Sequence, residues 1–229
     1  DEAIAVMAQV TAAIDRVKYR TSPWAGVQVG VATIFHGQLL TTIGRYDEAE
    51  AKLREGLAMV HRLRNSGIDP NVVGRRFRIG TIWAQMEYIA LTGLARNLLR
   101  QNRLGEAEVA ARAAVAGALT RFGRYSPYTA QALTGMARTL IQQGRFDEAR
   151  RLGTAILEIF DRIGARPDAV LRTHTRSDLA AIDVVRGRWD AAARTFDALQ
   201  ADLRAAGSAA FGDTLRGDAN YLLTLIKTG

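Results

Sequence analysis

The residues best suited to recognise a ligand are two arginines that each follow a threonine at a spacing of four. Thr92 precedes Arg96, and Thr134 precedes Arg138. Residues four apart share one face of a helix, and a guanidinium group pairs well with a carboxylate. We therefore predict that Arg96 and Arg138 hold an acidic peptide or a C-terminal carboxylate. The alternative is that both arginines pair with acidic neighbours inside the protein.

Position along the chain adds two residues to this predicted site. Gln38 lies six residues before Gly44, just as Arg138 lies six residues before Gly144. His174 falls near the same predicted face, although exposure as a lone histidine is the simpler interpretation of it. The predicted peptide-binding groove consists of Gln38, Thr92, Arg96, Thr134, Arg138 and His174.

A second cluster combines three arginines with one aromatic ring, between Gly74 and Arg78. Arginines can contact phosphates, and an aromatic ring can stack on a base. The segment is therefore a candidate anion-binding loop, in which nucleic acid is one conceivable ligand and a solvated basic loop is the alternative. Its residues are Arg75, Arg76, Phe77 and Arg78.

The remaining residues capable of chemistry have structural explanations. His36, His61 and His174 have no partner at the spacing of a zinc motif, and the chain has no cysteine. His36 is expected in the core. The acidic pairs Asp47-Glu48 and Asp147-Glu148 fall where helices would begin, and carboxylates stabilise a helix N-terminus. No nucleophile elbow, phosphate loop or dinucleotide fingerprint is present. We therefore expect no enzymatic activity, no metal and no cofactor.

A repeated turn accounts for the position of these acidic pairs. A glycine or asparagine is followed two residues later by an aromatic residue or leucine, and five residues later by alanine. Copies of this turn begin at Gly44, Asn102, Gly144 and Gly187, at separations of 58, 42 and 43 residues. Glycines that could end a helix follow each turn at Gly67, Gly123, Gly164 and Gly207. The spacing predicts helix pairs with a period of about 42 residues.

This period predicts one repeat domain over residues 1–229, with about ten helices. The last helix is predicted over 213–228. The expected parts are a half repeat over 1–18, repeats over about 23–66, 81–122, 127–163 and 168–206, a final half repeat over 213–229, and an insertion over about 68–80. Because both ends fall inside a repeat, we expect a fragment of a larger protein, whose exposed half repeats could make end-to-end contacts.

The turn and the helix before it resemble the tetratricopeptide-repeat (TPR) family with a long period. The family's large-small pair occurs as Leu94-Ala95 and Met136-Ala137, whereas His36-Gly37 is a weak match. Arg176 and Asp183 depart from the pattern because they occupy normally apolar positions. The resemblance implies an all-α, right-handed α-α superhelical solenoid of antiparallel helix pairs. It also implies a non-catalytic scaffold that binds a peptide or protein in a concave groove lined by the first helices.

Composition limits the remaining possibilities. The net charge is +8, almost entirely from arginine, which permits acidic partners. No apolar run approaches the roughly 20 residues that span a bilayer. The chain begins with Asp1 rather than Met, so removal of a signal peptide stays open, and we favour the cytoplasm. The alternative function is a sensor or regulatory solenoid of a larger bacterial signalling, transcription-regulating or CHAT-type protease protein, with nucleic-acid contact through the basic loop.

Overall fold

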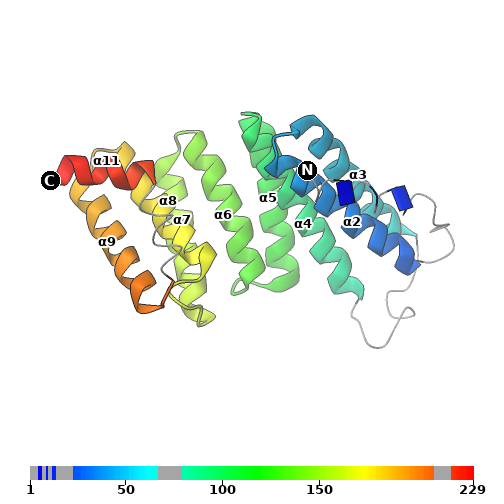
Figure 1. Cartoon of the computed structure of the whole chain (residues 1–229). Coiled ribbons are helices and arrows are strands. Elements are labelled where there is room, and N and C mark those ends of the chain that lie inside the picture. Colours follow the sequence, from blue (N-terminus) through cyan, green and yellow to red (C-terminus); the bar gives the residue numbers. More distant parts are fainter. Residues whose placement is uncertain (1–4, 7–8, 10–11, 14–22, 67–78, 209–217) are drawn as a thin grey trace. The chain divides into compact units, whose positions relative to one another are not determined.

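The computed structural model describes residues 5–6, 9, 12–13, 23–66, 79–208 and 218–229, and these residues contain helices but no β-strand (Figure 1). The all-α fold expected from the sequence is therefore confirmed. The helices are α2 (Pro23–Thr42), α3 (Tyr46–Asn65), α4 (Ile79–Arg100), α5 (Leu104–Phe122), α6 (Pro127–Gln142), α7 (Phe146–Arg162), α8 (Val170–Val185), α9 (Trp189–Ala205) and α11 (Ala219–Thr228). The chain divides into two compact units, Asp1–Arg121 and Phe122–Gly229, and each is described by itself.

The same turn joins the first and second helix of every pair. The residue at its apex has a positive φ: 84° at Gly44, 58° at Asn102, 74° at Gly144 and 68° at Gly187. Glycine adopts this left-handed conformation freely, and asparagine tolerates it better than most residues. The next residue, an arginine, donates its backbone N–H to a carbonyl five residues earlier, as from Arg45 to Leu40 over 2.9 Å. These bonds close the end of each first helix.

In unit 1, glycines let the helices of the first pair approach closely. A Cβ added at Gly37 would lie 2.7 Å from Leu53 Cγ and 3.1 Å from the Ala49 carbonyl oxygen. A Cβ at Gly56 would lie 2.5 Å from Ile34 Cγ1. The His36-Gly37 pair therefore serves the packing that a large-small pair serves elsewhere, with His36 only 8% exposed.

A buried asparagine ties this pair to α4. The Asn97 side chain is fully buried, and its amide donates to the Tyr46 carbonyl over 2.9 Å. Its oxygen accepts from the Thr41 hydroxyl over 3.2 Å. Because a buried amide without partners is costly, this network favours one register of α4 against the turn between α2 and α3.

Unit 2 contains two described apolar clusters. One joins α6 and α7 through Ala130, Ala137, Ile156, Ile159 and Phe160. The other joins α8, α9 and α11, and it includes the edge-to-face pair Phe196 and Tyr221, whose ring centroids are 5.3 Å apart. Within unit 2, α7 thus packs on α6 and α8, and α9 packs on α8 and α11, as expected of stacked repeats.

Two helices begin later than the sequence indicated. The repeat expected from about residue 168 has its first helix from Val170, because Arg166 to Ala169 form a turn closed by an N–H to O=C bond of 3.1 Å. The helix expected from residue 213 begins at Ala219. Asp218 is its N-cap, with a carboxylate that accepts from the backbone N–H groups of Asn220 and Tyr221. In α3 the N-cap is Arg45, so Asp47 lies within the first turn.

None of the helices in the described residues is long and apolar enough to cross a membrane. The prediction of a single repeat domain over 1–229 stays a prediction, as do the predicted half repeat over 1–18 and the insertion, most of whose residues lie outside those described.

Candidate functional site

In unit 1 the predicted groove residues lie on neighbouring first helices. Thr92, Arg96 and Arg100 form an exposed or half-exposed stripe on α4, because they are spaced by four residues. Gln38 on α2 reaches this helix, and its amide donates to the Ile89 carbonyl over 3.3 Å. The Thr92 hydroxyl donates to the Tyr88 carbonyl over 2.9 Å. Gln38 and Thr92 are therefore occupied by contacts within the chain.

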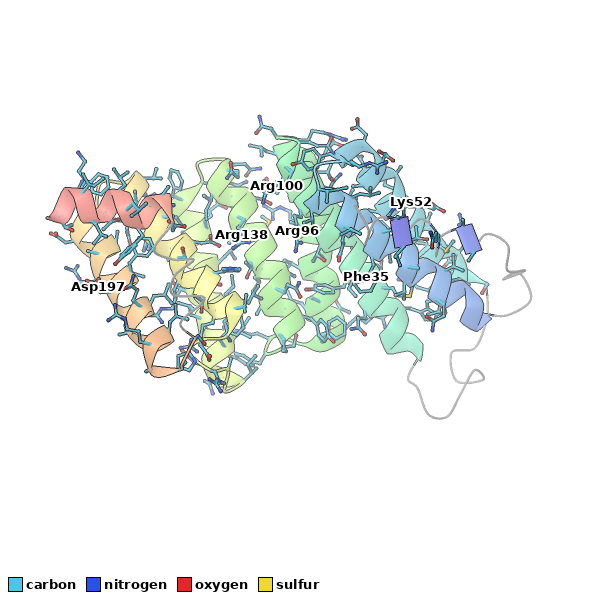
Figure 2. The ribbon with its side chains drawn as sticks, in the orientation of Figure 1. Phe35, Lys52, Arg96, Arg100, Arg138 and Asp197 are labelled. Carbon is cyan, nitrogen blue, oxygen red and sulfur yellow. The ribbon has the colours of Figure 1, made fainter. Side chains whose placement is uncertain are left out.

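Arg96 is exposed and forms no ion pair with any residue that the structure describes (Figure 2). The alternative, in which Arg96 pairs with an acidic neighbour inside the protein, does not hold among these residues. Arg100, one turn further along α4, is in the same situation, although the sequence did not single it out. A search for cations four residues apart on the predicted groove face would have found it.

Phe35 on α2 is a second exposed residue that sequence reasoning missed. Its side chain is 49% exposed, and it lies one helical turn before Gln38 on the same side of α2 (Figure 2). In the repeat, its position corresponds to Gly93 of α4. The sequence signal that could have identified Phe35 is an aromatic residue at a first-helix position where α4 has glycine.

In unit 2 the groove residue Arg138 is occupied by an ion pair. Its Nε donates to Asp178 Oδ2 over 2.9 Å, which joins α6 to α8. Thr134 is buried, and its hydroxyl donates to the Ala130 carbonyl over 2.9 Å. Arg138 therefore pairs with an acidic residue inside the protein, whereas Arg96 makes no described ion pair.

His174 lies beside this ion pair and is half-buried, so the expectation of an exposed histidine is corrected. Burial lowers its pKa from the usual 6.5, and repulsion by Arg138 lowers the pKa further, while Asp178 acts in the opposite direction. Burial and Lys52 likewise lower the pKa of His36. Both imidazoles are thus held toward the neutral form.

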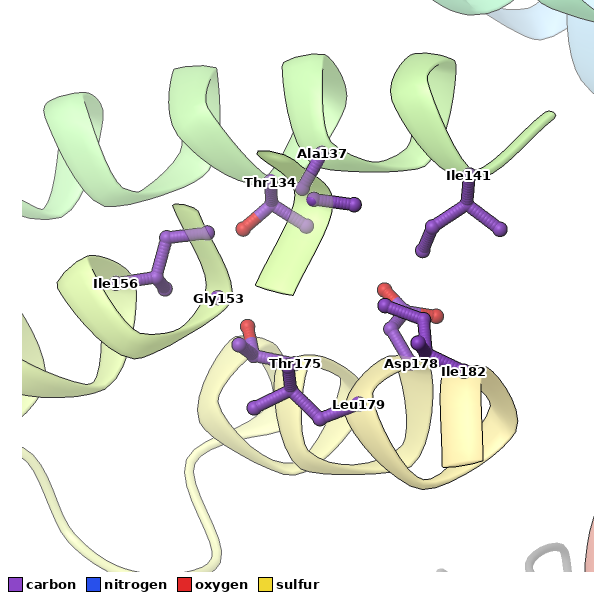
Figure 3. Close-up of a pocket in the computed structure, with 10 residues that line it drawn as sticks. Thr134, Ala137, Ile141, Gly153, Ile156, Thr175, Asp178, Leu179 and Ile182 are labelled. Carbon is purple, nitrogen blue, oxygen red and sulfur yellow. The ribbon is translucent and has the colours of Figure 1, made fainter. Parts of the chain in front are cut away.

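A small hollow lies between α6, α7 and α8, and Asp178 is one of the residues that line it. Figure 3 shows Thr134 and Ala137 from α6 across from Thr175 and Asp178 of α8. Its free volume is about 10 Å³, which is room for one water molecule at most. The hollow is a packing defect beside Gly153, and it is too small to hold a ligand.

The predicted site is divided between the units. Gln38, Thr92 and Arg96 belong to unit 1, whereas Thr134, Arg138 and His174 belong to unit 2. The alignment of the two threonine-arginine pairs side by side stays a prediction. Arg75, Arg76, Phe77 and Arg78 of the predicted basic loop lie outside the described residues.

Histidine and acidic residues elsewhere have structural contacts. His61 Nε2 lies 3.2 Å from Glu87 Oε1, and Arg64 donates to the other oxygen of the same carboxylate over 3.2 Å. Within the part of the chain that the structure describes, no three histidine or acidic side chains gather as metal ligands would. Asp147 pairs with Arg186 over 2.7 Å, which lowers its pKa.

Comparison with known proteins agrees with this architecture. Residues 87–162 match one tetratricopeptide-repeat family model, and residues 173–198 match a second. No curated protein sequence matches the chain.

Solved structures with a similar fold include BtubC (BKLC) from P. vanneervenii, at a TM-score of 0.64 and 18% identity over 93% of this chain and 86% of that one. A putative kinesin light chain from P. anserina, with nearly identical TPR-like repeats, aligns at a TM-score of 0.59 and 14% identity over 89% of this chain and 97% of that one. At these identities the likeness is one of fold.

Proposed function

Because the chain is a tetratricopeptide-repeat protein, we propose that it is a non-catalytic scaffold that binds a protein or peptide partner on the faces of its first helices. The observation that carries this proposal is the exposure of Phe35 and Arg96 on the neighbouring helices α2 and α4. Neither side chain contributes to the described core or to a described ion pair.

An exposed aromatic ring and a free guanidinium are the groups that protein interfaces use most. Aromatic residues and arginine are enriched at the centres of interfaces, where a few side chains carry most of the binding free energy. Around them, the Gln38 and Thr92 side chains are held by bonds to α4 carbonyls. Such fixed neighbours lose little conformational entropy when a partner binds, which favours this face as a docking surface.

Peptide selection tests the proposal, because a random library samples many candidate partner sequences at once. The library would be selected against the full chain, and the affinities of the recovered peptides measured for F35A and for L119A. Leu119 is the matched control, since it is 44% exposed on the second helix α5 of the same unit. We expect F35A to weaken binding by about tenfold, or about 1.4 kcal/mol, and L119A to leave it unchanged.

Two results would overturn the scaffold proposal for this face. One is the failure of selection to give any peptide that binds the folded chain better than the unfolded chain. The other is a set of peptides that respond to L119A but not to F35A. Regulation through nucleic acid stays a prediction, because it depends on Arg75 to Arg78, which lie outside the described residues.

A further inference from the structure

Two arginines on α4 have no anionic partner inside the described part of the protein. Arg96 and Arg100 are both exposed, and neither makes an ion pair with a described residue (Figure 2). They are four residues apart, so they project from the same side of the helix. Two cations in this arrangement repel each other and destabilise the helix.

The arginines of the other first helices differ from this pair. Arg138 of α6 binds Asp178 over 2.9 Å, and Arg172 of α8 binds Asp161 over 2.7 Å. Arg176 of α8 is paired with Asp202. Among the first helices that the structure describes, unpaired arginines therefore occur on α4 alone.

No local feature of α4 offsets both charges. Its acidic residue Glu87 lies more than two turns away and is held by His61 and Arg64 of α3. The helix dipole favours a cation in the last turn, which accounts for Arg100. It does not account for Arg96, which lies a full turn further from the C-terminal end of the helix.

We propose that Arg96 and Arg100 together bind a carboxylate-bearing segment of the partner protein, and that Arg138 does not take part. This inference rests on the proposed scaffold function and deepens it. Each guanidinium can bind a carboxylate through two parallel hydrogen bonds. Cβ atoms four apart on a helix are about 6 Å apart, so the pair suits two acidic side chains at a similar spacing.

The number of charges favours a peptide over nucleic acid. Proteins that bind the phosphate backbone typically contact about 6–10 phosphates. The described stripe offers two free guanidinium groups, and its neighbours Gln38 and Thr92 are neutral and bonded within the chain. A ligand with a few closely spaced carboxylates matches this surface better than a long polyanion.

A fluorescent peptide with two Glu-Glu pairs, titrated with the full chain between 50 and 300 mM NaCl, tests the inference. We expect R96Q and R100Q each to weaken binding three- to tenfold and to reduce its salt dependence. In two control variants the peptide affinity should stay within twofold of that of the parent protein. R138Q changes a first-helix arginine that is held in an ion pair, and R62Q changes an exposed second-helix arginine with no described ion pair. The double variant R96Q/R100Q should melt no lower than the parent protein, because a repulsion is removed.

Several outcomes would overturn the inference. Equal losses for R62Q and R96Q would mean unspecific attraction to a basic protein. Unchanged binding in R96Q and R100Q would show that these arginines do not contact the peptide. Tighter binding of a single-stranded DNA than of the peptide would show that the ligand is a nucleic acid. If R96Q and R100Q leave binding unchanged but the selected peptides still respond to F35A, the scaffold proposal stands and only the arginine proposal is wrong. If the selected peptides do not respond to F35A either, both proposals are wrong.

Discussion

Arg188 donates its Nε to Asp183 Oδ1 over 2.8 Å, a contact that the other three turn arginines do not make. Arg45, Arg103 and Arg145 instead bind a glutamate three residues later, each with an Nε to carboxylate distance of 2.7 Å. The position equivalent to that glutamate after Arg188 is Ala191. The last turn thus lacks its usual acid, and the arginine turns back to an acid placed in the first helix.

This exchange explains why Asp183 occupies a position that is leucine in the other pairs. Leu40, Leu98 and Leu140 at that position are 1–2% exposed, and Asp183 is 6% exposed. Its carboxylate also accepts from Arg150 of α7 over 2.5 Å. A buried acid is stable here because two guanidinium groups satisfy it.

Removing this carboxylate should destabilise unit 2. We expect D183A to lower the free energy of unfolding by about 1–2 kcal/mol. This is less than the usual cost of breaking a buried ion pair, because the Arg150 and Arg188 side chains are 33% and 44% exposed and can reach water. D183L restores the apolar side chain of the other repeats and should lose less than D183A. Urea unfolding followed by circular dichroism measures both, and a larger loss in D183L would contradict this account.

The close approach of α2 and α3 predicts opposite effects for two glycine-to-alanine changes. G37A gains about 1 kcal/mol of helix propensity but forces a Cβ against Leu53 and the Ala49 carbonyl, so we expect a net loss of about 1–2 kcal/mol. Gly135 of α6 is the control, because a Cβ there meets no atom within 4 Å. G135A should stabilise the protein by about 0.5–1 kcal/mol. Thermal unfolding of the two variants compares them, and a stabilising G37A would refute the packing argument.

The helix pairs were predictable because their signal is local. Positive φ favours glycine and, less strongly, asparagine, so Gly44, Asn102, Gly144 and Gly187 mark the turns directly. Helix starts were less predictable. Asp218 can act either as a helical residue or as a cap, and the choice depends on whether its carboxylate turns back to the backbone.

The partners of the groove residues were not predictable from the sequence. Asp178 lies 40 residues after Arg138, and their pairing depends on how α6 packs against α8. The pattern treated Arg96 and Arg138 as equivalent, yet only the packing of each helix decides whether an acid is in reach. The sequence marks Phe35 only as an aromatic residue where the equivalent position of α4 is Gly93. Its exposure depends on the folded neighbourhood.

The N-cap of α6 offers a prediction that concerns helix ends. Ser126 Oγ accepts a hydrogen bond from the Thr129 backbone N–H over 3.1 Å, and Pro127 follows at the first helical position. S126A should therefore destabilise the protein by about 1 kcal/mol. Ser177, in the interior of α8, makes no described hydrogen bond, so S177A should be neutral or slightly stabilising. Equal stability of the two variants, measured by urea unfolding, would show that the cap contributes nothing.

The buried histidines predict how stability depends on pH. Burial lowers the pKa of His36 and His174 below 6.5 in the folded protein, so the unfolded chain takes up protons first as the pH falls. Stability from these groups is therefore present above about pH 6.5 and is lost as the pH falls through their folded pKa values. The pKa of Glu48 is lowered from 4.5 by its bond to Arg45, so stability from that carboxylate is lost only below about pH 4.5.

Thermal unfolding between pH 3.5 and 7.5 separates the histidine contribution from the carboxylate contribution. We expect the melting temperature of the parent protein to fall as the pH drops from 7.5 to 5. H174Q should reduce that fall, and H36Q/H174Q should reduce it further, because glutamine binds no proton in this range. Below pH 4.5 all three proteins should lose stability in parallel through their carboxylates. An unchanged slope between pH 7.5 and 5 in the double variant would show that neither imidazole is held in its neutral form.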